Sequence, residues 1–559
     1  MPYKSRWNID IPNANLATIL VKSPTGPLSK TTKCFIDAKR PDTHYFSPHD
    51  FRLWCQRFAF GLLKSGLKPG DRVLLFSGND LFFPVAFLGI IMAGGIFTAA
   101  NPTYVARELA YQLQDSGAKY LLCATASLDT GLEAAKQAGL SQENVYVFDS
   151  ALFDGNRNPQ KGCPYWGDLV ASAEDGEGFI WDDLSTTELA DRTLVLNYSS
   201  GTTGRPKGVE ITHKNYVSNM LQFAYMPKLH PDYKTRRPNM RWLCFLPMYH
   251  AMAQNIYIAA AMEHGTPVYI LPKFDLVQML ECIQRFRITD LHLVPPIVVL
   301  LAKHPIVKNY DLSSILSIGS GAAPLGREVC VEAEKLWPPG LVNIRQGWGM
   351  TETTCSVMGW HPCEKSDSAA VGEPNANCEV KLMAEDGITE ILAREKRGEM
   401  WVRGPNVMKG YWRNAKATQE TKTADGWLRT GDIAYVDDHG KIHVVDRMKE
   451  LIKVKGNQVA PAELEALLLE HAAIADVAVI GVTMDNDERP RAYVVLKPEQ
   501  SATSEEIVRF MDGKVSATKR ITGGVVFLDT IPKNPSGKIL RKVLRDQAQA
   551  ELKGVTAKL

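Results

Sequence analysis

The sequence predicts an α/β protein: a large N-terminal domain with mainly parallel sheets, followed by a small α+β domain. Three observations support this fold class. The chain has 559 residues, 45% apolar and 23% charged, which is too long for one hydrophobic core. Before Asp446, short apolar runs alternate with segments of helical periodicity. After Asp446, a charged stretch, MKELIKVKG, leads into a shorter α+β pattern of about 110 residues.

The first domain shows its elements in order. Ser47 and Pro48 suit the N-cap and first turn of a helix, and apolar side chains follow at helical spacing (Phe51, Trp54, Phe58 and Leu62). We expect strands in DRVLLFSGN, KYLLCA, NVYVFD, TLVLNYS, PVYILP, DLHLVPP and SILSIGS. Residues 154–167, rich in Gly, Pro and Asn, predict a surface loop.

One uncharged stretch is long enough to cross a membrane. Leu81 to Ala100 contains no charge, and about twenty apolar residues span a bilayer. However, Pro84 lies in its first turn and Gly94-Gly95 interrupts it. We therefore expect a buried helix ending near Ala93 and a short buried strand, IFTAA, rather than a transmembrane segment. The N-terminus has no apolar region typical of a secretory signal.

The net charge argues against nucleic-acid binding, and the cysteine pattern argues against a structural metal. The formal net charge is +2, whereas nucleic-acid-binding surfaces usually carry a strong basic excess. The ten cysteines contain no C-x-x-C pair, and Cys355 and Cys363 have no further Cys or His at metal-binding spacing. We expect reduced thiols in an intracellular protein and no structural metal.

A phosphate-binding loop is predicted at 198–208, YSSGTTGRPKG. Its glycines let backbone N–H groups approach anionic oxygens, its hydroxyls donate, and Lys207 adds charge. A Walker loop is excluded because Gly201 and Gly204 are three apart and Gly208 follows Lys207. A flexible linker would not explain the Pro-Lys-Gly ending or the apolar run before the loop. The expected ligands are Ser199, Ser200, Gly201, Thr202, Thr203, Gly204 and Lys207.

This run resembles the phosphate-binding signature of the adenylate-forming superfamily, which contains acyl-CoA ligases, luciferases and peptide-synthetase adenylation domains. Further stretches fit in the family's order: PMYH at 247–250, SGAAPLG at 320–326, QGWGMTE at 346–352, the segment 426–465, and NPSGKILRK at 534–542. Their wording is most similar to 4-coumarate:CoA ligases and their fungal and insect relatives. The resemblance implies an N-terminal AMP-binding domain over 1–446, with stacked, mainly parallel sheets plus a β-subdomain. It also implies a mobile C-terminal lid domain over 447–559, hinged near Lys449.

The resemblance also implies a two-step reaction. A carboxylic acid reacts with ATP to give acyl-AMP and pyrophosphate, and CoA then displaces AMP. Glu352 would hold Mg²⁺, and with Thr351 it would serve the α-phosphate. Trp348 would stack on adenine, where the family often has Tyr. Asp432 would accept from both ribose hydroxyls, and Arg447 would add a ribose or phosphate contact. The other implied nucleotide ligands are Gly321, Ala322, Ala323, Gln346, Gly347 and Gly349.

The remaining implied roles concern catalysis and the acid. Lys538 would bridge the carboxylate and α-phosphate, supported by Lys453 and Gln458, although a loop lysine is often only solvated. His250 would act as a gate between the nucleotide and acyl pockets, or is a buried structural histidine. The implied acyl pocket contains His250, Met252, Asn255, Gly321, Gly349, Cys355 and Ser356. Met252 replaces a Tyr, and Cys355-Ser356 a Pro-Val pair, of plant coumarate ligases. The expected acid is therefore aromatic (cinnamate-, phenylacetate- or benzoate-like) or medium-chain aliphatic.

Three alternatives stay open: luciferase-like oxidation of the acyl-adenylate, loading of a separate carrier protein, and a non-catalytic binding protein. A light assay or a test of CoA against a carrier as acceptor separates the first two from a CoA ligase. The last three residues, Ala557, Lys558 and Leu559, resemble the SKL peroxisomal address. They predict recognition by the peroxisomal import receptor, with cytoplasmic location otherwise, and a eukaryotic source. The family resemblance implies a source of fungal type.

Overall fold

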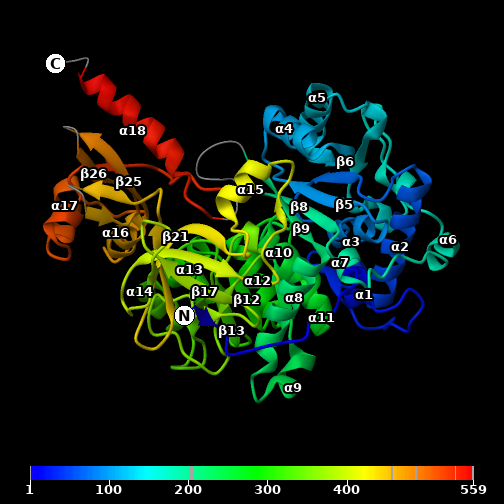
Figure 1. Cartoon of the computed structure of the whole chain (residues 1–559), viewed down its shortest axis with the longest axis horizontal. Helices are drawn as coiled ribbons and strands as arrows, with labels where there is room; N and C mark the ends of the chain where they lie inside the picture. Colours follow the sequence, from blue (N-terminus) through cyan, green and yellow to red (C-terminus); the bar gives the residue numbers. More distant parts are fainter. Residues whose placement is uncertain (1, 200–205, 455–456, 485–486, 535–536, 557–559) are drawn as a thin grey trace.

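The structure is a computed structural model that describes residues 2–199, 206–454, 457–484, 487–534 and 537–556 (Figure 1). Within them, two seven-stranded sheets and a six-stranded sheet form the body of the molecule. A smaller unit with its own sheet follows at the C-terminus and lies at one end of the body. The predicted mixed α/β architecture is confirmed.

The first sheet has the strand order β20-β9-β8-β5-β4-β6-β7. Five of its strands are parallel: β4 (Arg72–Phe76), β5 (Ile96–Ala100), β6 (Ala118–Ala124), β7 (Val145–Phe148) and β8 (Thr193–Ser199). β9 (Lys207–Thr212) and β20 (Gly410–Tyr411) extend it in antiparallel fashion. β8 and β9 flank the predicted phosphate loop, whose residues 200–205 lie outside the described part of the chain.

The second sheet has the order β14-β13-β12-β10-β11-β2-β3. Its strands are β2 (Phe35–Asp37), β3 (Tyr45–Phe46), β10 (Trp242–Cys244), β11 (Val268–Ile270), β12 (Asp290–Leu293), β13 (Ser317–Ser320) and β14 (Ile344–Gln346). Only the pairing of β3 with β2 is antiparallel. The apolar runs expected to form strands do so in both sheets.

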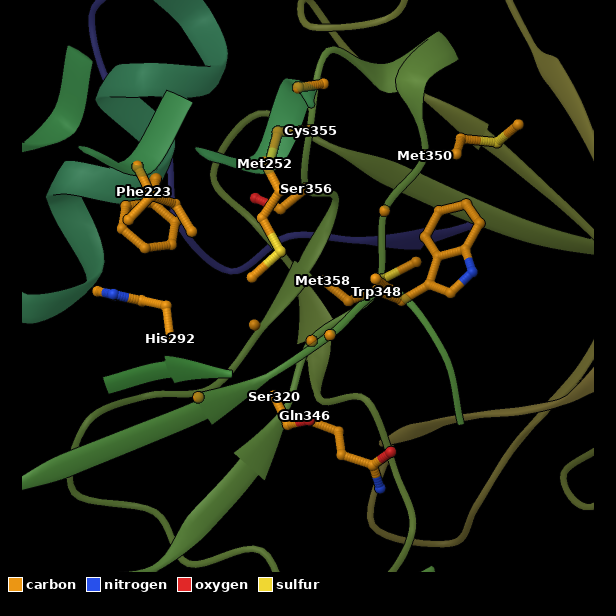
Figure 2. A pocket seen from close by; sticks show the side chains of 18 of the residues that line it. Phe223, Met252, His292, Ser320, Gln346, Trp348, Met350, Cys355, Ser356 and Met358 are labelled. Carbon is orange, nitrogen blue, oxygen red and sulfur yellow. The ribbon is translucent and has the colours of Figure 1, made fainter. Parts of the chain in front are cut away.

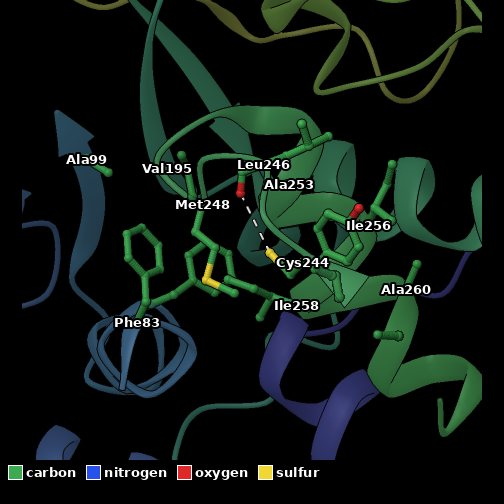
Figure 3. Close-up of a cluster of buried hydrophobic side chains, with 14 of the residues drawn as sticks. Phe83, Ala99, Val195, Cys244, Leu246, Met248, Ala253, Ile256, Ile258 and Ala260 are labelled. Atoms are coloured by element: carbon green, nitrogen blue, oxygen red, sulfur yellow. Dashed lines mark hydrogen bonds between the residues drawn. The ribbon is translucent and has the colours of Figure 1, made fainter. Parts of the chain in front are cut away.

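The main core joins these two sheets. Helix α2 (Pro48–Lys64) begins at the predicted N-cap, where Ser47 and Asp50 form a capping box. Helix α3 (Phe83–Met92) is buried on all sides and leads to the buried strand β5. Figure 3 shows Phe83 of α3 in one cluster with Ala99, Val195 and Cys244 from both sheets. The stretch 81–100 is therefore core, and no helix among the described residues is long and apolar enough to span a bilayer.

The other α-helices and the π-helix of the body cover the sheets or connect their strands. They are α1 (Leu16–Val21), α4 (Ala106–Ser116), α5 (Leu128–Ala138), α6 (Ala173–Glu177), α7 (Thr187–Ala190), α8 (His213–Lys228), α9 (Tyr233–Arg236), α10 (Ala251–Ala253), the π-helix η6 (Gln254–Ala260), α11 (Ala261–His264), α12 (Leu276–Phe286), α13 (Pro295–Lys303), α14 (Arg327–Glu334) and α15 (Ala415–Thr421).

The predicted surface loop at 154–167 needs a correction. Tyr165 and Trp166 at its end are fully buried. The Trp166 ring packs against Phe58 and Phe82, with centroids 5.6 and 5.0 Å away. The large apolar area of two adjacent aromatic residues outweighs the polar composition of the preceding loop.

The third sheet is antiparallel and begins with the first residues of the chain. Its path is β1 (Tyr3–Lys4), β17 (Glu379–Met383), β19 (Gly398–Arg403), β21 (Leu428–Val436) and β22 (Ile442–Arg447), with β18 (Glu390–Ile391) paired to β17. The turn between β21 and β22 is held by Asp437, whose carboxylate accepts from the Lys441 N–H at 2.8 Å. A separate pair, β15 (Met358–Gly359) and β16 (Glu373–Pro374), lies beside the site.

The C-terminal unit has hydrophobic clusters of its own. Its elements are β23 (Ile452–Val454), β24 (Asn457–Val459), α16 (Pro461–Leu468), β25 (Ile474–Met484), β26 (Asp487–Leu496), α17 (Ser504–Asp512), β27 (Val525–Phe527) and α18 (Arg541–Thr556). Among the described residues, the main core runs up to Ile442, and the C-terminal clusters begin at Ile452. This unit carries the loop that brings Lys538 to the site.

Candidate active site

A cavity of about 1770 Å³ lies where the second sheet, the third sheet and the C-terminal unit meet. The carboxyl ends of β13 and β14 open into it, as in other α/β ligand sites. Of the predicted site residues, those lining it are Ser199, Lys207, His250, Met252, Gly321, Ala322, Gln346, Gly347, Trp348, Gly349, Thr351, Glu352, Cys355, Ser356, Arg447 and Lys538. Ser200, Gly201, Thr202, Thr203 and Gly204 lie outside the described residues.

Glu352 is a buried carboxylate held by two hydroxyl donors. The Glu352 residue is only 6% exposed. Oε1 accepts from Ser199 Oγ at 3.0 Å and from the Tyr411 hydroxyl at 2.9 Å. Lys207 Nζ lies 4.7 Å from the centroid of the Tyr411 ring. The phosphate loop and QGWGMTE therefore meet directly through Ser199 and indirectly through Tyr411. Tyr411 carries no sequence signal because it belongs to none of the predicted motifs.

Trp348 and Asp432 contact each other directly. The indole Nε1 donates to Asp432 Oδ2 at 2.8 Å, and Arg447 Nε lies 3.6 Å from Oδ1. Burial raises the pKa of the Asp432 carboxyl, while Arg447 opposes that shift. Asp432 lies within β21, behind Trp348 rather than on the cavity wall. The indole N–H thus bonds one of the two oxygens expected to accept ribose hydroxyls.

Lys538 of the C-terminal unit and His250 of the body both line the cavity. The Lys538 N–H donates to Asn534 Oδ1 at 2.8 Å, which fixes the loop. Burial lowers the pKa of Lys538 to about 8; Arg447 adds to this shift, and Asp432, Glu450 and Glu352 oppose it. Burial and the Lys538 charge lower the pKa of His250 to about 4, so this imidazole is neutral near pH 7. His250 also caps α10, accepting from the Met252 N–H at 3.4 Å.

Besides Asp432, four predicted residues do not line the cavity. Lys453 and Gln458 face each other across β23 and β24 and are exposed, and Gln458 Nε2 donates to Glu385 Oε1 at 2.8 Å. Asn255 is fully buried in η6, off the cavity wall, and its amide donates to Asn219 Oδ1 at 2.8 Å. Ala323 also lies off the cavity wall. Gln346 lines it, but its Oε1 accepts from the Leu325 N–H at 2.9 Å and so secures SGAAPLG.

The predicted acyl region is formed mainly by sulfur-containing and aromatic side chains. Figure 2 shows Met252, Cys355 and Ser356 across the pocket from Phe223 and His292, with Met358 beside Trp348. A Cβ on Gly349 would lie 1.7 Å from the Cys355 carbonyl oxygen, so only glycine fits there. Burial raises the pKa of the Cys355 thiol to about 12, which keeps it protonated. Phe223 and His292 carried no motif signal.

Comparisons with known proteins agree with this geometry. Residues 31–412 match the family model described as AMP-binding enzyme, and residues 463–538 match the AMP-binding enzyme C-terminal domain. The chain therefore belongs to the AMP-binding enzyme family of the adenylate-forming superfamily.

Relatives match over most of their length. An acyl-CoA synthetase of Alternaria alternata is 38% identical over 504 residues, covering 89% of this chain and 85% of the relative. The 4-coumarate–CoA ligase 2 of Oryza sativa subsp. japonica is 38% identical over 538 residues, covering 92% and 90%. The ATP-bound MatB structure from Rhodopseudomonas palustris aligns with TM-score 0.80 at 26% identity, covering 96% and 99%. An anthranilate CoA ligase with anthranoyl-AMP shares the fold, with TM-score 0.83 at 22% identity, covering 98% and 99%.

Proposed function

We propose residue roles and an acid class for a reaction whose type follows from the family and its relatives: the chain is an ATP-dependent, AMP-forming acid–CoA ligase. The observation that carries the residue roles is the desolvated ammonium of Lys538, which lines one cavity with Glu352 and Arg447 and is influenced by the charge of Asp432 behind it. In the proposed reaction, a carboxylate and an α-phosphate would meet beside it. Products of the reaction test this directly: AMP and pyrophosphate support it, whereas ADP and phosphate contradict it.

Lys538 is proposed to stabilise charge during adenylation. A carboxylate attacking the α-phosphate concentrates negative charge between two anions, and a buried cation there acts with little screening. Because the Lys538 pKa is lowered to about 8, the ammonium is still charged near pH 7. Removing such a contact costs about 10²–10³ in rate. Lys538→Ala should therefore slow acyl-AMP formation and spare thioester formation from supplied acyl-AMP.

Mg²⁺ is proposed to bind at Glu352. Magnesium prefers carboxylate and phosphate oxygens. Ser199 and Tyr411 both bond Oε1, so Oε2 is the oxygen that would bind the cation. The residues present therefore fit the ion. When bound with ATP, Mg²⁺ would neutralise phosphate charge, and the two hydroxyls would orient the carboxylate toward it.

We propose that two domains, residues 1–446 and 447–559, move about a hinge near Lys449. This movement would serve the two half-reactions in turn. Lys538 lies in the cavity, whereas Lys453 and Gln458 lie outside it. Rotation of the C-terminal unit would withdraw Lys538 and present the β23–β24 hairpin. Lys449→Pro fixes φ and removes an N–H at the hinge, so acyl-AMP should accumulate while CoA ester formation falls. Equal loss of both half-reactions in a folded variant would contradict rotation.

The acid is proposed to be aromatic or medium-chain aliphatic, from the Met, Cys and Phe walls of the acyl region. Pyrophosphate release from cinnamates, phenylacetate, benzoates and fatty acids from hexanoate upward is the test. Transfer to a carrier protein in preference to CoA, or light emission with a luciferin, would favour the alternative activities instead.

Peroxisomal import through Ala557-Lys558-Leu559 is a separate proposal, supported by the sequence motif. These residues lie outside the described part of the chain. With a fluorescent protein at the N-terminus, punctate fluorescence should become diffuse when the three residues are deleted. An unchanged distribution would contradict the proposal.

A further inference from the structure

The acyl region continues past its Met and Cys walls into a polar channel. Residues of β12, β13 and β14 line the cavity, and so do Leu316 and Leu341, which are 37% and 46% exposed. The floor of this channel is the second sheet. Helices α8 and α9 contribute Phe223 and Arg236 to its other walls.

Strand register places three residues side by side on the floor. In the parallel pairing, His292 lies opposite Gly319, and Gly319 lies opposite Arg345. Paired residues of neighbouring strands point to the same face, and strands are about 4.8 Å apart. His292 and Arg345 are therefore separated by about 10 Å, with no side chain between them.

Gly319 is what leaves this gap. Its φ is not in the left-handed region, so the backbone does not require glycine there. A Cβ at Gly319 would meet no atom within 4 Å. Any larger side chain would consequently project into the channel. The glycine keeps a path open between two polar residues.

His292 offers a neutral polar edge in an aromatic setting. Its ring centroid lies 4.9 Å from that of Trp242, 5.6 Å from Tyr257 and 5.8 Å from Phe223. Burial lowers its pKa to about 4. Nδ1 is enclosed without a hydrogen-bond partner among the described residues, and His292 lines the cavity, so Nε2 is the nitrogen left to bond a ligand.

Arg345 supplies the cation on the opposite side. Its Nε donates to Glu364 O at 2.9 Å and its Nη2 to Pro362 O at 2.8 Å. A guanidinium has five N–H donors, so these two carbonyls fix its plane and leave donors for a ligand. Arg236 is close enough to contribute, after burial, to lowering the Arg345 pKa.

We infer that this enzyme, if it ligates the acid class proposed above, selects acids that carry an oxygen acceptor at the end remote from the reacting carboxyl group. The His292–Gly319–Arg345 row would bind that oxygen. A second carboxylate suits Arg345 best because a guanidinium binds carboxylates with charge-assisted hydrogen bonds; a hydroxyl or keto oxygen would use the same donors.

The row also sets an approximate length. Gly321 and Gly347 belong to the predicted nucleotide site, so the distance is counted from them. Gly319 lies two residues before Gly321, and Arg345 lies two residues before Gly347, which is about 7 Å along each strand. With C–C bonds of about 1.5 Å, an extended chain covers that distance in about five or six bonds. One step further, Asp290 lies opposite Ser317, its pKa raised by burial and its carboxylate bonded by Thr289. A longer diacid would bring its second carboxylate toward Asp290.

The test compares acids of equal length that differ only at the far end. Hexanoate, 6-hydroxyhexanoate and hexanedioate, with the octanoate series beside them, are measured by pyrophosphate release. In the unaltered enzyme we expect kcat/KM for the far-end carboxylate to exceed that for the plain acid by about 10- to 100-fold. If the hydroxyl acid performs best, an uncharged acceptor is the ligand. Equal or better use of the plain acids would overturn the inference.

Two variants assign the effect to the row. Arg345→Met should lower kcat/KM for the diacid about 10-fold or more, change the plain acid less than threefold, and leave the KM for ATP unchanged. Gly319→Leu places an apolar side chain in the open gap, where its Cβ meets no atom within 4 Å, and should remove use of the longer acids while sparing benzoate. Lys335→Met, at an exposed site on the same unit, is the control. Loss of every acid alike in folded Gly319→Leu would contradict the channel.

The outcomes also separate this inference from the proposed reaction. No pyrophosphate release with any acid would contradict the proposed acid class itself. Release that ignores the far end would contradict only the channel.

Discussion

Lys303 connects the body to the C-terminal unit, and its removal should unbalance the two half-reactions. It is the last residue of α13, and Nζ donates to Leu469 O at 3.0 Å and to Ile474 O at 3.1 Å. Both carbonyls belong to the C-terminal unit. Rotation of that unit about Lys449 would break both hydrogen bonds, so they favour the conformation in which Lys538 lies in the cavity.

The magnitude follows from these two bonds. A hydrogen bond to a charged group contributes about 1.5–3 kcal/mol, and partial burial of the ammonium, which lowers the Lys303 pKa to about 8, offsets part of that sum. We take about 2 kcal/mol for the pair, which corresponds to roughly a 30-fold change in the conformational equilibrium. Lys303→Met keeps the apolar stem and removes the donor.

The assay is single-turnover measurement of each half-reaction. In Lys303→Met, acyl-AMP formation should slow by up to about 30-fold, whereas thioester formation from supplied acyl-AMP and CoA should be unchanged or faster. Lys308→Met alters an exposed lysine beside the same helix and is the control. Equal slowing of both steps, or the same effect in Lys308→Met, would refute the argument.

Three further outcomes concern the nucleotide site. The kcat/KM for adenylation should fall as pH rises through about 8, because Lys538 loses its charge above its lowered pKa; Lys538→Arg should remove that limb, and a retained limb would assign it elsewhere. Trp348→Phe keeps an aromatic ring but removes the N–H that donates to Asp432. The KM for ATP should rise about 5- to 10-fold, with kcat unchanged. Tighter ATP binding in this variant would instead show that the indole N–H competes with ribose for Asp432. Tyr411→Phe removes one of the two donors to Glu352 and should raise the Mg²⁺ concentration for half-maximal rate severalfold, as a titration would detect.

The fold was largely readable from the sequence because its strands are short and buried. The run TLVLNYS has few ways to be stable other than as a central strand, and Ser47-Pro48 encodes a helix start locally. The end of 154–167 was misjudged because composition describes a segment as a whole, while Tyr165 and Trp166 decide where its last residues lie.

The site was less readable than the fold. Motif loops that follow parallel strands converge on one edge, so most of their residues line the cavity. Asn255 does not, because its direction depends on the π-helical turn of η6. Whether Lys453 and Gln458 reach the cavity depends on the orientation of the C-terminal unit. His292, Gly319 and Arg345 form a row only through register between strands that are distant in sequence, and no local pattern contains that information.

The pairing of β1 with β17 has a consequence for synthesis of the chain. Tyr3 pairs with Val380, and Arg6 beside it bonds Glu373, 367 positions later. At typical translation rates, about 20 to 70 seconds separate the emergence of the two partners. During that interval the first residues have no native strand to join, and their shortness and the charges of Lys4 and Arg6 disfavour pairing with other chains. A nascent chain that stops before β17 therefore holds its own beginning unpaired.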